Sequence, residues 1–235
     1  MTVGIMQPYF MPYLGYFALI NYVDEFILFD TPQFIRHGWI ERNKVLKPDG
    51  DTMYIKVPLN KHARKTPINE VSINNNLNWQ SKIIAQLGHY KKKAPFYNQL
   101  MALLESLFNK EYTSIVSLNY DALHIVMQYL EIETPIKVWS EMNIKIGQVV
   151  APDEWALQIA KAIDAKTYVN PPGGKAFFDK SKYDQSNINL KFLEYLPQKY
   201  NQFGNTFVSH LSIIDLLMFC SVGEIKNMLK TINLS

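Results

Sequence analysis

The sequence predicts a single α/β domain over residues 1–235, with a mostly parallel, Rossmann-like sheet. Short apolar runs at residues 2–6 and 25–29 predict buried strands, and residues 15–23 between them have the apolar spacing of a helix. Strand, helix and strand in this order predict a βαβ unit, in which a right-handed crossover joins two parallel strands. Strands continue to alternate with helices downstream, which favours an α/β fold.

The remaining segments extend this alternation. Strands are predicted at residues 53–59, 135–140, 167–169 and 190–195, and helices at residues 79–90, 95–109, 114–130, 154–163, 212–220 and 222–229. Three consecutive helices, over about residues 77–130, interrupt the pattern because no strand lies between them. We expect them to form a helical insertion or a cap on the sheet.

Composition and charge limit the class of function. The chain is 48% hydrophobic and 19% charged, as in a folded globular protein. Its formal net charge is only +3, and this weak overall field argues against non-specific nucleic-acid binding as the main activity. The 14 tyrosines suit either a Tyr-rich core or a half-apolar, wet binding surface.

Cysteine usage and hydropathy indicate a reducing compartment. Cys220 is the single cysteine, so no intrachain disulfide and no Cys/His zinc spacing is available. The N-terminal residues lead into a strand-like run without the basic start of a signal peptide, and no apolar stretch reaches transmembrane length. We therefore expect a cytoplasmic protein without membrane insertion. The oligomeric state stays open, with a homodimer as one option.

Positive charge is concentrated in one short segment. All three arginines, Arg36, Arg42 and Arg64, lie there together with several lysines. Arginine suits planar, bidentate capture of phosphate or carboxylate. The segment is either a solvated basic loop or the binding site of a phosphate-bearing substrate.

The turn after the first strand is the first candidate site. Ligands of open parallel sheets bind beyond the carboxyl ends of strands, where Gln7 and Tyr9 could hydrogen-bond a base or a sugar. Gly15, followed by Tyr16, lets a backbone or ligand approach the helix start, and helix N-termini bind phosphate. The alternative is a stiff structural turn with aromatic packing.

A second candidate site follows the strand at residues 25–29 and should reach the same edge of the sheet. Asp30 and His37 are candidates for a catalytic base, and Arg42 is a candidate for stabilising developing negative charge. Further candidate substrate-binding residues of this segment are Gln33, Arg36, Trp39, Asn43 and Lys44. The alternative for His37 is a solvated side chain in a basic loop.

A glycine-containing loop follows the strand at residues 167–169. Asn170, Gly173, Gly174 and Lys175 could cradle an anion there, although the loop lacks the spacing of a P-loop. The alternative is a tight turn without a ligand.

A fourth segment lies near the C-terminus. Ser212 is expected to cap a helix with Asp215 in its first turn, and this capping-box-like arrangement explains both residues without a function. His210, just before the cap, is a candidate substrate-binding residue. Elsewhere the sequence has no Ser/His/Asp triad signature, nucleophile elbow or metal motif, so no metal site is predicted and the cofactor is unknown.

At these positions the chain is similar to members of the WbqC-like family, nearly from end to end. The shared residues are Gln7-Pro8-Tyr9, Pro12, Gly15-Tyr16, Gln33-Phe34, Gly38-Trp39, Arg42-Asn43, Ala94-Pro95, Leu118-Asn119, Asn170-Pro171-Pro172-Gly173-Gly174, Tyr200 and the run 211–219. Together they are far more specific than any one alone. One departure is Glu41, where a neutral asparagine is expected, and it makes the local charge less positive.

The first βαβ unit is also similar to the nucleotidylyltransferase and pantothenate-synthetase type of α/β domain. In that type the helix start carries two histidines that hold ATP phosphates, and here Pro12 and Tyr16 stand at those positions. This second resemblance implies nucleotide binding at the same edge of the sheet rather than adenylate chemistry.

The WbqC-like resemblance implies a role in bacterial surface-polysaccharide biosynthesis, including O-antigen and lipopolysaccharide. The expected activity is an acyl- or aminoacyl-transferase, glycyl transfer included, that modifies the amino group of a nucleotide-linked amino sugar. Its partners would be that sugar and an acyl or aminoacyl donor. One alternative is an ATP-dependent enzyme that activates a carboxylate as an acyl-adenylate, with Mg²⁺ held by Asp30. Another is a non-catalytic protein that binds nucleotide sugars or acts as a scaffold.

Overall fold

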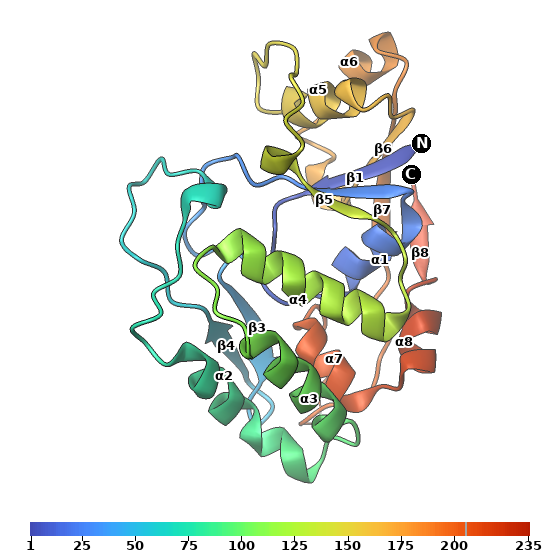
Figure 1. Cartoon of the computed structure of the whole chain (residues 1–235). Coiled ribbons are helices and arrows are strands. Elements are labelled where there is room, and N and C mark those ends of the chain that lie inside the picture. Colours follow the sequence, from blue (N-terminus) through green and yellow to red (C-terminus); the bar gives the residue numbers. More distant parts are fainter. Residues whose placement is uncertain (205) are drawn as a thin grey trace.

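The computed structural model of the chain describes residues 1–204 and 206–235 (Figure 1). Within these residues, one sheet has six strands in the order β5-β2-β1-β6-β7-β8, and β3 and β4 form a separate pair. The strands of the main sheet are β1 (Thr2–Met6), β2 (Glu25–Leu28), β5 (Ile136–Val138), β6 (Thr167–Asn170), β7 (Asn189–Tyr195) and β8 (Ile232–Leu234). Adjacent strands are parallel except for β7 and β8, which confirms the prediction of a mostly parallel sheet.

The N-terminal βαβ unit is confirmed. β1 leads through α1 (Leu14–Tyr22) to β2, which pairs with β1 in parallel with Val3 opposite Glu25. All four residues of β2 are buried, as expected for a central strand of a sheet with both faces covered. Seven consecutive residues of α1, from Leu14 to Ile20, are buried as well, so this helix lies inside the protein.

Helices cover both faces of the main sheet (Figure 1). Side chains of a strand alternate between faces, and in β2 Phe26 belongs to the larger core while Ile27 belongs to the smaller one. The helices that contribute to the larger core include α1, α7 (Ile213–Phe219) and α8 (Val222–Met228), and those of the smaller core are α5 (Glu154–Ala162) and α6 (Lys180–Gln185). The sheet is therefore wound on both sides, as in Rossmann-like proteins.

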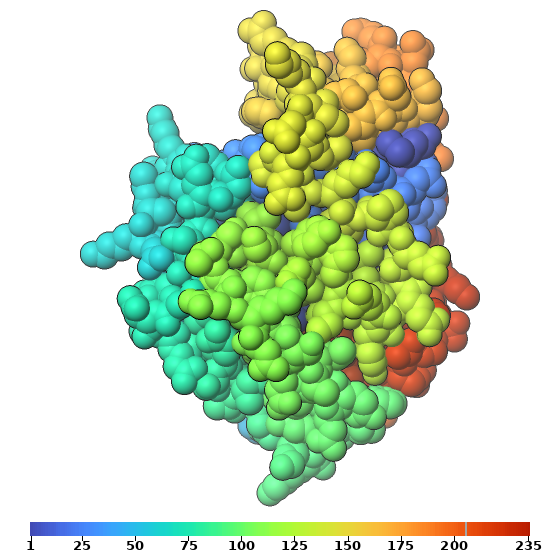
Figure 2. Space-filling model, viewed as in Figure 1, coloured from blue at the N-terminus to red at the C-terminus, as the bar shows by residue number. Residues whose placement is uncertain are grey.

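A long insertion separates β2 from β5. It consists of the hairpin β3 (Arg42–Leu46) and β4 (Thr52–Lys56), followed by α2 (Trp79–Leu87), α3 (Tyr97–Phe108) and α4 (Ile115–Leu130). The three predicted helices are confirmed, although the insertion is larger than predicted because it begins with the hairpin. In Figure 2 the later part of the insertion, in cyan and green, forms one continuous surface beneath the yellow region around α5.

Two strands and one α-helix of the described residues were not predicted from the sequence. β3 begins with Arg-Asn-Lys and looks like part of a polar loop, yet its alternate residues Asn43 and Val45 are buried. α6 is six residues long and buries a single side chain, Tyr183, and β8 is a three-residue edge strand. Among the helices of residues 1–204 and 206–235, none combines the length and the apolar character needed to cross a membrane.

Candidate functional site

The strand order creates a crevice at the carboxyl end of β1. This strand lies between β2 and β6, so the chain moves to one side of β1 first and returns on its other side much later. In open parallel sheets, ligands bind at such a switch point, outside the carboxyl ends of the strands. Gln7 follows β1 and Pro171 follows β6, so two of the candidate segments meet at this point.

A cavity of about 340 Å³ opens at this switch point. Its lining is mainly apolar and aromatic and consists of Met6, Tyr9, Pro12, Tyr13, Trp39, Asn43, Pro171 and His210. A neighbouring cavity of about 430 Å³ shares Met6 and Tyr9 with it and extends to Trp155 of α5 and to Phe177. We call the two together the cleft. Their volumes lie in the range of small-molecule binding sites.

The turn after β1 is held by hydrogen bonds to its backbone carbonyls. Asn43 of β3 donates through Nδ2 to the carbonyls of Phe10 (3.1 Å) and Met11 (2.8 Å). Asn119 of α4 donates through Nδ2 to the carbonyl of Pro8 at 2.9 Å. Both asparagines are buried, so these bonds form away from water and fix the turn against the insertion.

Two further side chains complete this support. The hydroxyl of Ser212, which caps α7 as predicted, donates to the carbonyl of Met11 at 2.7 Å. The Tyr16 hydroxyl of α1 donates to the carbonyl of Gln7 at 2.8 Å. Met11 has a φ of 42°, a conformation that non-glycine residues adopt rarely, and its carbonyl is held by two donors. We call residues 7–13, with these supports, the platform.

The start of α1, where phosphate binding was predicted, lies under an aromatic ring. A Cβ atom on Gly15 would lie 2.3 Å from the Tyr13 ring, so only glycine allows the ring to pack this closely. Tyr13 packs edge-on against His210 with ring centres 5.2 Å apart. A ligand in the cleft therefore meets these two rings before it meets the backbone of α1.

Burial affects the phenols of the platform. It raises the pKa of Tyr9, with a further contribution from the neighbouring Tyr13, and it raises the pKa of Tyr13 itself. The pKa of Tyr16, which is completely buried, is raised well above its ordinary value by the same cause. These phenols stay protonated at neutral pH, so the Tyr9 and Tyr13 side chains offer the cleft O–H donors.

Asp30 lies outside the lining of the cleft. It is fully buried, and its carboxylate accepts hydrogen bonds from the backbone N–H (3.0 Å) and the hydroxyl (2.5 Å) of Ser140. It therefore joins the end of β2 to the short turn after β5. In the part of the chain that the structure describes, no group of three or more His, Cys, Asp and Glu side chains could hold a metal ion.

Arg42 and Lys44 lie on β3 beside the cleft. The Arg42 guanidinium donates to the carbonyls of residues 37 and 38, and its central carbon lies 4.2 Å from the centre of the Tyr54 ring. Arg42 thus holds the turn that leads to Trp39. The Lys44 ammonium lies 5.9 Å from the centre of the Trp39 ring, which brings a positive charge to the edge of the cleft.

The glycine-containing loop after β6 is folded on itself. Asn170 lines the cleft and accepts a hydrogen bond of 2.8 Å from the Tyr168 hydroxyl. The backbone N–H groups of Gly174 and Lys175 donate to carbonyls three residues earlier in the same loop. They are therefore engaged within a short 3₁₀ turn, Pro172–Gly174, rather than directed together at one point.

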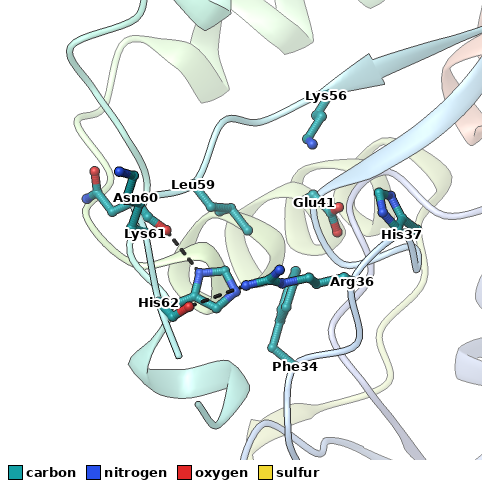
Figure 3. Close-up of a pocket in the computed structure, with 9 residues that line it drawn as sticks. All are labelled: Phe34, Arg36, His37, Glu41, Lys56, Leu59, Asn60, Lys61 and His62. Atoms are coloured by element: carbon teal, nitrogen blue, oxygen red, sulfur yellow. Dashed lines mark hydrogen bonds between the residues drawn. The ribbon is translucent and has the colours of Figure 1, made fainter. Parts of the chain in front are cut away.

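A second cavity of about 420 Å³ lies between the segment before β3 and the segment after β4 (Figure 3). It is lined by Phe34, Arg36, His37, Glu41, Lys56, Leu59, Asn60, Lys61 and His62. The basic segment therefore serves two cavities, because Trp39 and Asn43 line the cleft while Arg36 and His37 line the second cavity.

The structure brings together part of the predicted set of site residues. Lining the cleft are Gln7, Tyr9, Trp39, Asn43, Asn170 and His210. Lining the second cavity are Arg36 and His37. Outside these linings lie Gly15, Tyr16, Asp30, Gln33, Arg42, Lys44, Gly173, Gly174 and Lys175.

Several residues of both cavities were missed. Trp155, at the start of α5, is more than a third exposed and has its ring centre 5.5 Å from that of Phe29, but no local motif marks it. Tyr13 lies inside a recognised motif and could have been chosen for its place beside Gly15. His62 had no signal beyond its residue type, and Glu41 stood out only as an acidic residue where a neutral asparagine is expected. The importance of both residues depends on burial, which the sequence does not show.

The fold and the cleft define an α/β protein whose cleft lies at the switch point of a sheet covered on both faces. The sequence model of the WbqC-like protein family matches residues 7–227, so the chain belongs to this family. The chain is also similar to Rv1507c, an uncharacterised protein of Mycobacterium tuberculosis, with 25% identity over 217 residues that cover 92% of each chain. No solved structure matches.

Proposed function

We propose that this protein is a transferase that acylates the amino group of a nucleotide-linked amino sugar for surface-polysaccharide synthesis. The observation that carries the proposal is the aromatic cleft at the switch point of the sheet. Trp39, Tyr9 and Tyr13 offer flat faces on which a nucleobase or a sugar ring can pack. The Lys44 ammonium beside Trp39 supplies positive charge for a diphosphate.

The chemistry needs a group that removes a proton. The neutral sugar amine attacks the acyl carbonyl, a C–N bond forms, the bond to the donor's leaving group breaks, and the nitrogen loses a proton. We assign that proton to His210, because its imidazole lines the cleft and this type of side chain serves most often as a general base. His37 lines the second cavity and Asp30 is engaged by Ser140, so neither is the base in this proposal.

Negative charge develops on the carbonyl oxygen during the attack. The protonated phenols of Tyr9 and Tyr13 can donate hydrogen bonds to it from the cleft wall. Arg42 serves the same site indirectly, because its guanidinium holds the turn that carries Trp39. We therefore treat Arg42 as a positioning residue.

Binding is tested by calorimetric titration with UDP-glucosamine and its N-acetylated counterpart. We expect saturable binding that Trp39→Ala weakens by roughly 1–3 kcal/mol through lost stacking. Trp39→Phe, which keeps an aromatic face, should retain most of the affinity. Folded wild-type protein that binds no nucleotide-linked sugar would contradict the proposal and favour a role in binding a protein partner. A response to ATP alone would favour carboxylate activation.

Transfer is tested by mass spectrometry of the sugar after incubation with coenzyme A thioesters of small acids. His210→Gln should lower the rate by about 10²- to 10⁴-fold, the usual contribution of a general base. His124→Gln is the matched control, because His124 also packs on a tyrosine ring but lies on α4 in a different cavity. Equal rates for the two variants would remove His210 from the mechanism.

A further inference from the structure

The second cavity contains buried polar atoms that have no partner. Among the described residues, four buried side-chain atoms make no hydrogen bond: Thr31 Oγ1, Glu41 Oε2, His62 Nε2 and Asn119 Oδ1. Two of the four, on Glu41 and His62, belong to residues that line this one cavity. Buried polar groups in folded proteins are nearly always hydrogen-bonded, so these two atoms mark places at this cavity where a bound molecule could supply the missing bonds.

Glu41 is the stronger of the two signals. It is only 3% exposed, and among the described residues it takes part in no ion pair. Arg36, Lys56 and Lys61 line the same cavity and are exposed to solvent. Arg36 extends across the cavity toward His62, and its guanidinium donates to the carbonyl of His62 at 3.5 Å (Figure 3). A buried carboxylate without a cationic partner is costly, so this side chain is suited to a partner that enters the cavity.

The tautomer of His62 determines whether the ligand must supply a hydrogen-bond donor or an acceptor at Nε2. Its Nδ1 lies 2.9 Å from the carbonyl oxygen of Asn60, so Nδ1 carries the hydrogen and donates it. In the neutral ring, Nε2 is then an acceptor with a bare lone pair. Glu41 Oε2 is also an acceptor. The two unpaired atoms therefore both require hydrogen donors from the ligand.

We propose that the second cavity binds a small zwitterion of the amino-acid class, with its ammonium group held by Glu41 and His62. A primary ammonium carries three N–H donors and one positive charge, which matches two acceptors and a buried carboxylate. We expect the acid group of the same molecule to pair with one of the exposed cations of the lining, which are Arg36, Lys56 and Lys61 and which we call the rim cations. A simple anion would leave Glu41 unpaired, and a simple cation would interact with none of the three rim cations.

This site is separate from the cleft. The residues that line it are different, although the segment 36–43 contributes to both. The inference therefore does not rest on the proposed transferase activity. Loss of nucleotide-sugar binding would leave it intact, and loss of zwitterion binding would leave the cleft proposal intact.

The probes are glycine, alanine and serine, titrated into the full chain by ligand-observed NMR. N-acetylglycine has no ammonium group and glycinamide has no carboxylate, so these two molecules test the two halves of the proposed site. We expect at least one of the three amino acids to bind, and both half-ligands to bind much more weakly. Equal binding of N-acetylglycine would overturn the assignment of Glu41 and His62 as ammonium acceptors. Equal binding of glycinamide would overturn the role of the rim cations.

The variants are Glu41→Gln and His62→Phe, with Glu133→Gln as an exposed glutamate control. Glu41→Gln keeps an oxygen acceptor but removes the negative charge that attracts the ammonium group, and this loss should weaken binding by roughly 10- to 100-fold. His62→Phe keeps a ring against Phe34, so it should fold while losing the second acceptor. Thermal unfolding midpoints identify variants that are not folded. Wild-type affinity in both folded variants, or no binding of any of the three amino acids to the wild type, would overturn the proposal.

Discussion

The platform and the second cavity are built from neighbouring parts of the chain but differ in whether their buried polar groups are hydrogen-bonded. On the platform, side-chain donors of Tyr16, Asn43, Asn119 and Ser212 bind the backbone carbonyls of residues 7–13. In the second cavity, Glu41 and His62 each leave a buried atom without a partner.

This difference separates residues that support a site from residues that bind at one. Asn43, Asn119 and Ser212 of the recognised motifs donate their side-chain hydrogen bonds to backbone carbonyls of the protein itself, so they fix the shape of the cleft wall. Glu41 and His62 support no backbone through these atoms, so folding alone does not explain them. One exception within the platform is Asn119 Oδ1, which is also unpaired although the Nδ2 atom of the same side chain is fully engaged.

The largest effect is expected for Asn119→Leu. The substitution leaves the carbonyls of Pro8 and Ile40 buried without their 2.9 Å donors. An unsatisfied buried group costs about 1–3 kcal/mol, so the two should lower the free energy of unfolding by roughly 2–6 kcal/mol. Chemical denaturation measures the change.

The control for this variant is Asn98→Ala, which alters an exposed asparagine on α3. It should change stability by no more than about 0.5 kcal/mol. If Asn119→Leu were equally mild, the platform would not depend on this side chain, and the contrast between the two regions would disappear.

Glu41→Met is expected to raise the free energy of unfolding, whereas Asn119→Leu lowers it. The methionine has a similar length and no polar atom to satisfy, so removal of the unpaired carboxylate should stabilise the ligand-free protein by roughly 1–3 kcal/mol. Residues kept for binding often reduce stability in this way. Glu133→Met, at an exposed site, should leave the unfolding free energy nearly unchanged. A destabilised Glu41→Met protein would show that the carboxylate has a structural role.

A smaller, pH-dependent effect is expected at Asp215, which lies on α7 one turn after Ser212. Burial raises the pKa of this carboxyl even though Tyr90 (2.5 Å) and Tyr200 (2.7 Å) donate hydrogen bonds to it. Its contribution to stability is therefore fully present below about pH 4 and is lost as the pH rises through the raised pKa. The stability of Asp215→Asn, relative to wild type, should improve between pH 4 and pH 7.

Asp121 differs from Asp215 in that its pKa is lowered rather than raised. Burial acts to raise its pKa, but hydrogen bonds from Lys110 and Tyr112, together with the charge of Lys110, lower the pKa overall. The stability that Asp121 contributes is present above about pH 4 and is lost as the pH falls through the lowered pKa. The free energy of unfolding of Asp121→Asn should therefore be closest to that of the wild type at low pH. Denaturation curves that drift in the same direction for both variants would contradict this assignment.

The sequence predicted the main sheet because its strands are short apolar runs between helical segments. It could not predict β3, because Asn43 points inward and is stabilised by carbonyls more than thirty residues away in the chain. The prediction for Ser212 was correct, but the capping-box interpretation of Asp215 was wrong, since its carboxylate is bound by Tyr90 and Tyr200. These tyrosines reach Asp215 from other segments, which local spacing does not reveal.

The site was predicted to the extent that it follows from strand order. Residues at the carboxyl ends of β1 and β6 meet at the cleft because parallel strands end at one edge. The basic segment was treated as one site, and its division between two cavities follows from the turn at residues 37–41, where His37 has a φ of 64°. The need for a partner at Glu41 depends on burial, which requires the whole fold.

The most direct test of two separate sites is a crossed titration of UDP-glucosamine and glycine against wild type, Trp39→Ala and Glu41→Gln. We expect Trp39→Ala to weaken binding of the nucleotide sugar and to leave glycine binding near the wild-type value. Glu41→Gln should weaken glycine binding and leave the nucleotide sugar unaffected. If each variant weakened both ligands equally in folded protein, the cleft and the second cavity would be one site, and the division drawn between them would be wrong.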